Sequence, residues 1–235
     1  MKIVKKTFGN HACSVPERWI RRCILLSIIP AVLGQSSEVV SPPYEPLIER
    51  GLQMDLWARE PLLINPVALS FDEQGRLYVV ETARRGTVDI DIRAHKGWVK
   101  EDLGSVSISR QIELFRKWMA PEKSRENRSW LQDRNEDGSH DWRDLTMVKE
   151  RVHLIEDTDG DGVADQSRVF AEGFNKENNG AAAGVMPFAD HVYYTVYPDI
   201  WRLEDTDGDG VSDRNTSLFR GFGVHAAYDL SLIHI

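Results

Sequence analysis

Short runs in which hydrophobic and polar residues alternate fill most of the chain after residue 50, as expected for β-strands. Two such runs, 66–71 and 76–82, flank the polar turn 72–75, and together they predict a β-hairpin. Further strands are predicted at 52–58, 151–155, 167–171, 191–196 and 199–203. The pattern therefore predicts an all-β fold.

The hydrophobic period changes between residues 94 and 128, where a helical segment is predicted. Apolar residues recur there on one helical face, at Ile108, Ile112, Phe115 and Met119. Ser107 is placed to cap the start of the helix, and Pro121 ends it. We expect an insertion in the β chain whose aromatic face packs against the body. A binding surface is the alternative.

An acidic motif interrupts the strand pattern twice, as EDTDGDGVAD at 156–165 and EDTDGDGVSD at 204–213, 48 residues later. A looser copy, DRNEDGSHD, stands at 133–141. All three fit DxDxDGxxD, whose oxygens at positions 1, 3, 5, 7 and 9 suit Ca²⁺. The predicted ligands are Asp157, Asp159, Asp161, Val163 and Asp165, then Asp205, Asp207, Asp209, Val211 and Asp213, and upstream Asp133, Asn135, Asp137 and Asp141.

The motif is not a complete EF-hand, because position 12 lacks the bidentate Glu. That position holds Arg168 in one close copy, Thr216 in the other and Asp144 in the upstream copy. The close copies are also flanked by predicted strands rather than helices. We therefore expect calcium loops on strand connections. A solvated acidic turn is the alternative, since Asp and Gly are common turn residues.

The 48-residue spacing recurs in the pairs Gly173-Phe174 and Gly221-Phe222, which end two successive units. About four short strands per repeat is typical of a β-propeller blade. Residues 51–235 have room for about three to four blades, whereas a ring needs about four to eight. The predicted fold is therefore a partial, incomplete β-propeller with four-stranded blades. Because LSLIHI at 230–235 breaks the pattern, we expect a truncated reading frame with a foreign end.

Composition indicates a folded core and limits the possible partners. The 41% hydrophobic content supports a core, and a net charge of −8 without a basic stripe excludes nucleic-acid binding.

Residues 1–34 combine a basic start with the apolar run 23–33, which predicts a signal peptide cleaved before Gln35 and hence export. A buried apolar helix is the alternative. An extended linker is expected at 35–50. Both cysteines, Cys13 and Cys23, lie in the predicted signal, so no CxxCH haem site follows.

Four stretches together resemble a known family. They are EPLLINPVAL at 60–69, GRLYVVET at 75–82, the two EDTDGDG loops, and GFG at 221–223 followed by His225. Over about 52–228 the chain resembles the N-terminal part of the membrane-bound dehydrogenases abundant in planctomycetes and verrucomicrobia, relatives of the glucose/sorbosone dehydrogenases. The resemblance implies an exported six-bladed propeller that binds pyrroloquinoline quinone (PQQ) and oxidises a sugar or alcohol. It also implies a c-type cytochrome domain downstream, and quinone-binding residues mainly in later blades.

Three residues are candidates for chemistry. His225 follows a Gly-rich blade end, where a neutral imidazole would take the substrate hydroxyl proton. Arg84 follows a predicted strand at a loop where an anionic cofactor would bind, and Asn179 precedes a run of small residues that would line a pocket. The alternatives are a structural or surface His, surface charge and a plain turn. Two functions remain open: a quinoprotein-like dehydrogenase domain, inactive as this fragment alone, or a calcium-stabilised propeller for binding or adhesion.

Overall fold

The structure of the protein is a computed structural model that describes residues 3–5, 52 and 54–222. The chain divides into two units, one of which is Val4–Asp55, and the sheets and sites below belong to the other, which contains Leu56 onward. The predicted signal peptide and linker lie outside the described residues, apart from strand β1 (Ile3–Lys5). His225 also lies outside them.

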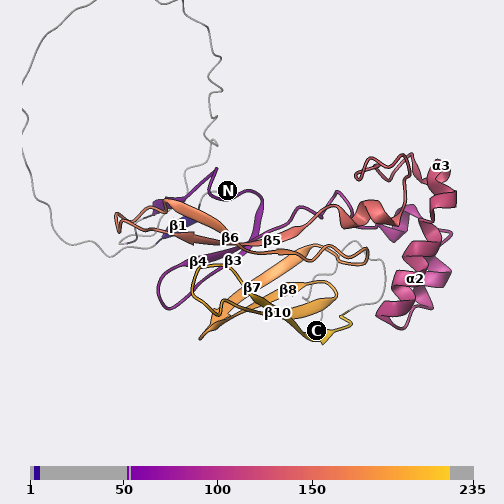
Figure 1. Cartoon of the computed structure of the whole chain (residues 1–235). Helices are drawn as coiled ribbons and strands as arrows, with labels where there is room; N and C mark the ends of the chain where they lie inside the picture. The colour runs from indigo at the N-terminus through magenta and orange to yellow at the C-terminus, as the bar shows by residue number, and fades with distance from the viewer. Residues whose placement is uncertain (1–2, 6–51, 53, 223–235) are drawn as a thin grey trace, which may run out of the picture. The chain divides into compact units, whose positions relative to one another are not determined.

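Two four-stranded antiparallel sheets form the body, and in each the strands follow one another in chain order (Figure 1). Sheet 1 consists of β3 (Pro66–Phe71), β4 (Leu77–Glu81), β5 (Glu150–Glu156) and β6 (Gln166–Gly173). Sheet 2 consists of β7 (Ala182–Phe188), β8 (His191–Val196), β9 (Asp199–Glu204) and β10 (Arg214–Arg220). The predicted all-β fold is confirmed. Within residues 54–222 the two sheets do not close a ring.

The sheets pack against each other through one hydrophobic core. Sheet 1 contributes Tyr78, Val80, Val152, Leu154 and Phe170, and sheet 2 contributes Val192, Tyr194, Val196 and Leu203. Along β8 these residues alternate with more exposed ones, as the period of two requires, whereas along β4 the intervening Leu77 and Val79 are buried on the opposite face. The other face of sheet 1 is covered by Trp57 and Ala58 of β2 (Asp55–Ala58) and by Leu63.

The 48-residue repeat in the sequence is a structural repeat. Each close copy of the acidic motif joins the third strand of a sheet to the fourth, and the strand pairs that enter them match, Glu156 with Gln166 and Glu204 with Arg214. Each pair also has a register shift near its far end. The two hairpins, β5–β6 and β9–β10, are therefore equivalent elements of one repeating unit.

A helical segment interrupts sheet 1 between β4 and β5 (Figure 1). It contains η1 (Ile92–Ala94), α1 (Val99–Leu103), α2 (Ile108–Trp118), η2 (Pro121–Lys123), α3 (Ser124–Asn127) and η3 (Trp142–Thr146). It therefore extends past the predicted boundary at 128. The segment has its own apolar core, which includes Leu114, Phe115 and Trp118. None of the helices in the described part of the chain has the length and apolar character needed to cross a bilayer.

Helix α2 has its predicted cap but a different buried face. The Ser107 side chain accepts a hydrogen bond from Arg110 N–H, as expected for an N-cap. The residues buried along α2 are Gln111, Leu114, Phe115 and Trp118, whereas Ile108 and Ile112 are half-buried. The buried face is rotated because Gln111 points inward, where its amide donates to the Tyr197 hydroxyl at 2.8 Å.

Two strands of the four-stranded sheets, β7 and β10, were not predicted, and β2 is shorter than expected. β7 contains Gly184 and Pro187, which weaken a strand signal, but β7 is an edge strand and tolerates both. β10 is almost wholly exposed, so it lacks an apolar alternation. The strand predicted at 52–58 begins at Asp55. Edge positions explain the first two differences, because such strands need only one hydrogen-bonded neighbour.

Candidate metal centres

The two close copies of the acidic motif each bring three carboxylates together. In loop 1 (157–165) they belong to Asp157, Asp159 and Asp161, and in loop 2 (205–213) to Asp205, Asp207 and Asp209. One oxygen from each residue lies within 4.8 Å of the others. The first Asp of each loop is half-buried and the next two are exposed. Positions 1, 3 and 5 of the motif therefore converge as predicted.

Hydrogen bonds inside each loop fix this convergence. Asp157 accepts from the N–H groups of Gly160 at 2.8 Å and Gly162 at 3.0 Å, which wraps the chain around its carboxylate. Asp205 accepts from the equivalent glycines at 2.8 and 2.9 Å. Gly162 has a φ of 92°, a conformation that a residue with a Cβ rarely adopts, so the sixth position requires glycine.

The ninth position plays a different role from the one predicted. Asp165 accepts from both the N–H and the hydroxyl of Thr158, and Asp213 accepts from Thr206 in the same way, at 2.7 Å for both bonds. The Thr206 side-chain and backbone donors hold the pKa of Asp213 below its usual value. Neither residue belongs to the three-carboxylate clusters. Threonine at position 2 offers two donors at short range, so position 9 closes the loop.

The predicted carbonyl ligands at position 7 lie beside the clusters. The N–H of Val163 donates to Asp161 Oδ1, and that of Val211 donates to Asp209 Oδ1, both at 2.8 Å. This bond ties the backbone of position 7 to the carboxylate of position 5 in both loops. Position 7 is therefore held next to the cluster by the sequence of the loop itself.

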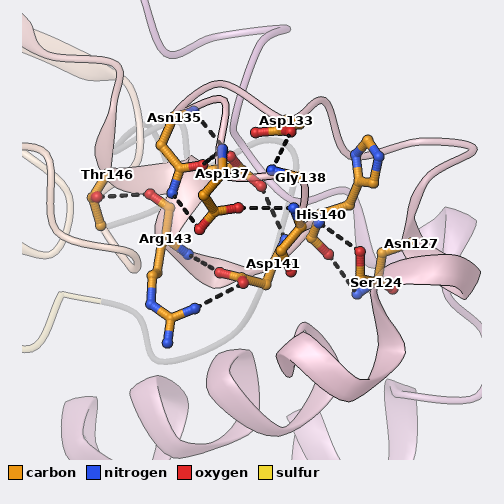
Figure 2. A network of polar contacts seen from close by, with 12 residues as sticks. Ser124, Asn127, Asp133, Asn135, Asp137, Gly138, His140, Asp141, Arg143 and Thr146 are labelled. Atoms are coloured by element: carbon orange, nitrogen blue, oxygen red, sulfur yellow. Dashed lines mark hydrogen bonds and ion pairs between the residues drawn. The ribbon is translucent and has the colours of Figure 1, made fainter.

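The upstream copy (133–141) has the same turn but a different charge arrangement (Figure 2). As in the close copies, Gly138 N–H donates to Asp133, and Ser139 N–H donates to Asp137. Asn135 changes the centre, because its amide donates to Asp137 Oδ2 at 3.1 Å. Position 3 thus carries an amide in this copy, where loops 1 and 2 have one of their three carboxylates.

Position 9 of the upstream copy, Asp141, also makes its contacts outside the acidic turn. Asp141 caps η3 and pairs with Arg143 at 2.9 Å, as Figure 2 shows. Asp144, at position 12, is fully buried and accepts from Arg134 N–H at 2.7 Å. This copy lies in the helical segment, next to η3, and not on a strand connection. The predicted ligands Asp133, Asn135, Asp137 and Asp141 thus do not form a cluster like those of loops 1 and 2.

The two clusters suit a hard, oxygen-seeking cation. Ca²⁺ takes about six to eight oxygen ligands, so three carboxylates, a backbone carbonyl and water would satisfy it. Position 12 of loop 1 cannot contribute, because Arg168 extends to loop 2, where it donates to the Asp209 carbonyl at 2.7 Å. It also pairs with Glu156 at 3.0 Å. A site with this ligand set should bind calcium more weakly than a complete EF-hand.

Arg84 does not present its charge to a ligand. The side chain is fully buried, and its guanidinium donates to four backbone carbonyls, those of Leu145, Val148, Lys176 and Asn179, at 2.7 to 3.3 Å. Burial lowers the pKa of Arg84 to about 10, although the charges of Glu150 and Asp89 oppose this. The predicted anion-binding residue is a clamp between the helical segment and the 174–181 connection.

Asn179 is occupied in the same way. Its carbonyl oxygen accepts from Lys176 N–H at 2.8 Å, and its amide donates to the Tyr197 carbonyl at 2.9 Å. The side chain is buried. Arg84 and Asn179 therefore do not fit the role of quinone ligands.

A buried carboxylate beside these residues was not predicted. Glu150 is fully buried at the start of β5 and accepts from Arg84 N–H at 2.8 Å, the Thr82 hydroxyl at 3.0 Å and Ala182 N–H at 3.3 Å. Burial raises its pKa, although these hydrogen bonds and the charge of Arg84 act in the opposite direction. Its partners lie 32 to 68 residues away, so no local pattern marks it.

Comparison with known proteins gives a family without a described activity. No curated protein and no solved structure matches the chain significantly. The sequence model of one family matches residues 47–230, which include both sheets, the helical segment and all three acidic loops. The chain therefore belongs to DUF7133, a family described as a domain of unknown function.

Proposed function

We propose that the chain is a calcium-binding β-propeller module of an exported protein, in which each cation fixes the outer hairpin of a blade. One observation carries the proposal. The same loop occupies the same place in both sheets and gathers three carboxylates within 4.8 Å each time. Outside the cytosol, calcium reaches the roughly millimolar level that weak extracellular sites need.

Electrostatics supports a cation in these loops. Two carboxylates about 4.8 Å apart repel by about 1 kcal/mol even in the dielectric of water. Each cluster contains three such pairs, and the hydrogen bonds inside the loop hold them in place. A divalent cation would convert this repulsion into attraction. The hydrogen bonds shape the turn, and a bound cation would offset the repulsion among its carboxylates in both sheets.

The propeller part of the proposal is supported by the free face of sheet 2. By register, Tyr193 corresponds to Tyr78, and Phe219 corresponds to Ala171. Tyr78 and Ala171 belong to the core by which sheet 1 packs on sheet 2. On sheet 2 this face leaves Met186, Phe188 and Phe219 exposed. A third sheet packed there would continue the arrangement, as successive blades do.

Calorimetric titration and thermal unfolding test the calcium proposal. At ten times the dissociation constant, each site should stabilise the fold by about 1.4 kcal/mol. For a chain of this size that is a rise in melting temperature of roughly 3–6 °C per site, reversed by a chelator. Asp161→Ala and Asp209→Ala should each remove one site.

The upstream loop supplies the matched control. Asp137 makes the same turn hydrogen bond as Asp161 and Asp209 but faces the Asn135 amide. Asp137→Ala should therefore leave the calcium-dependent rise unchanged while costing similar stability in chelator. An equal melting temperature with calcium and with chelator in the unsubstituted protein would refute the proposal.

A second proposal, oxidation of a sugar or alcohol with PQQ, is supported by the resemblance of 60–69 and 75–82 to the dehydrogenases. Those stretches adjoin in the fold, since Ile64 N–H donates to Glu81. His225 as base, the quinone ligands and electron transfer to a c-type cytochrome domain belong to this proposal. Titrating the longest form of the protein with PQQ and calcium, and following sugar-dependent dye reduction, tests it. Absence of quinone binding would exclude it.

A further inference from the structure

Three polar side chains from adjacent strands of sheet 1 form a continuous chain of contacts. Glu81 of β4 approaches His153 of β5, with Oε2 3.1 Å from Nε2. The other ring nitrogen of His153, Nδ1, lies 3.2 Å from the Ser167 hydroxyl of β6. The side chains of Glu81 and His153 are 14% and 16% exposed, and Ser167 is half-buried. A hydroxyl, a base and a group that orients the base thus stand within contact distance.

The surroundings fix the roles within this array. The contact between Nε2 and Glu81 is a close approach without hydrogen-bond alignment. With the hydrogen of the neutral ring on Nε2, on the side of the carboxylate, Nδ1 is left to accept from the Ser167 hydroxyl. Glu81 is held from its other side, where Oε1 accepts from Ile64 N–H at 2.5 Å. Burial acts to raise the pKa of Glu81, but the proximity of His153, the N–H of Ile64 and the charge of Arg151 together lower it. The carboxylate therefore stays ionised.

The repeat shows that the fold does not require these polar residues. By register and by the 48-residue spacing, sheet 2 has Val196, Trp201 and Asn215 at the positions of Glu81, His153 and Ser167. Val196 and Trp201 pack into the core between the sheets. Apolar side chains thus fill two of the three positions in sheet 2 and Asn215 fills the third, whereas sheet 1 has three groups there that can move a proton.

The hydroxyl lies where a substrate could be held by main-chain bonds. Among the described residues, β6 has a strand neighbour on one side, β5. Alternate N–H groups of such an edge strand point away from the sheet. Loop 2 contacts this edge at Phe170, so the N–H groups at the Ser167 end of β6 would be the donors for an oxyanion and for an extended acyl group.

We propose that Ser167, His153 and Glu81 form a nucleophilic site that transfers acyl groups from carboxylic esters. Ser167 Oγ attacks the ester carbonyl carbon while its proton passes to His153 Nδ1. The imidazolium, stabilised by Glu81, returns that proton to the departing alkoxide, which leaves as an alcohol. Water then attacks the acyl-serine by the same route, so that a carboxylic acid leaves and the hydroxyl is restored.

The test uses a fluorophosphonate, which bonds to an activated serine with loss of fluoride. Incubated with the full chain and analysed by peptide mass spectrometry, it should label Ser167. Ser167→Ala should abolish labelling, and His153→Gln should slow it about 100-fold or more. Ser217→Ala is the matched control, because Ser217 donates directly to the Asp199 carboxylate at 2.9 Å without an imidazole between them. In the Ser217→Ala variant, Ser167 should be labelled at the rate of the unsubstituted protein.

The role of Glu81 is tested by two substitutions. Glu81→Gln removes the negative charge beside the imidazolium and should slow labelling of Ser167, whereas Glu81→Asp keeps a carboxylate and should retain more of the rate. Equal labelling rates in the two variants would show that the charge of Glu81 plays no part. If folded protein gives no label at Ser167, or if His153→Gln labels as fast as the unsubstituted chain, the array is a polar ladder between strands and the proposal is wrong. Should His153→Gln fail to fold, Glu81→Gln decides, because labelling of Ser167 at an unchanged rate in that variant would overturn the proposal.

Discussion

Arg84 carries its positive charge into the protein interior, where backbone carbonyls accept hydrogen bonds from its guanidinium. Four of its five N–H groups are used in this way. The nearest carboxylate partner, Glu150, binds the main-chain N–H of Arg84 instead. A buried charge is tolerated when it is fully hydrogen-bonded, and removing it would leave several carbonyls without donors. Arg84 is therefore expected to dominate the stability of its surroundings.

Arg84→Met should destabilise the protein by at least about 3 kcal/mol, because the apolar side chain fills a similar volume but satisfies none of the carbonyls. Urea unfolding followed by circular dichroism measures the change. Arg85→Met is the neighbouring control. Arg85 is exposed, so its substitution should cost no more than about 0.5 kcal/mol. Equal effects of the two substitutions would contradict the clamp.

Glu150 should make stability depend on pH. Its pKa is raised in the folded protein, so the folded state holds the proton more tightly than the unfolded state does. The stabilisation is complete below the unfolded value of about 4.5 and is lost as pH rises through the folded value. Glu150→Gln should flatten the melting temperature above pH 4.5 relative to the unsubstituted protein. It should also lower stability throughout, because Gln has one acceptor oxygen where the carboxylate has two, so the NH2 group would face Ala182 N–H as a second donor. An unchanged pH profile would show that Glu150 ionises normally.

At the scale of elements, sequence patterns predicted most of the features that depend on residues close to one another in the chain. The hairpin of β3 and β4 was predicted because Asp72 and Gly75 form its turn, and the Asp72 side chain accepts from Arg76 N–H at 2.8 Å. The convergence of positions 1, 3 and 5 in loops 1 and 2 was predictable for the same reason. Position 9 is a local exception, because its partner is the threonine at position 2, a position that the metal-binding template leaves variable. The roles of Arg84 and Glu150 depend on residues more than 30 positions away, which no pattern in one sequence reveals.

Helix α2 is joined to sheet 2 by a buried polar contact, which explains its unexpected face. Gln111 donates to the hydroxyl of Tyr197, and burial raises the pKa of that hydroxyl to about 12. A double-mutant cycle with Gln111→Ala and Tyr197→Phe should give a coupling of about 1 kcal/mol in urea unfolding. Glu113→Ala in place of Gln111→Ala is the control, since Glu113 is exposed and pairs with Arg110. Strict additivity of Gln111→Ala and Tyr197→Phe would mean that the contact contributes nothing to the docking of α2.

At the scale of the whole molecule, the acidic loops also connect neighbouring layers. The N–H of Ser212 in loop 2 donates to the Phe170 carbonyl of β6 at 2.7 Å. The equivalent residue of loop 1, Ala164, donates to the Trp57 carbonyl of β2, also at 2.7 Å. Arg168 adds a second link from β6 to the Asp209 carbonyl. Each loop thus closes its own hairpin and touches the strand of the preceding layer.

This geometry predicts that calcium in loop 2 stabilises the interface between the sheets as well as the loop. Asp209 would bind the cation through its carboxylate while its carbonyl accepts from Arg168, so ordering one end of the residue restrains the other. Hydrogen exchange at Ser212 N–H should therefore slow by about tenfold when calcium stabilises the closed state by about 1.4 kcal/mol.

Asp209→Asn should abolish the slowing at Ser212 but keep it at Ala164, and Asp161→Asn should do the reverse. Arg168→Gln should raise exchange at Ser212 in chelator and in calcium alike, because it removes the link without removing a ligand. Slowing of exchange that stays confined to 205–211 would show that loop 2 binds calcium without transmitting its effect to sheet 1.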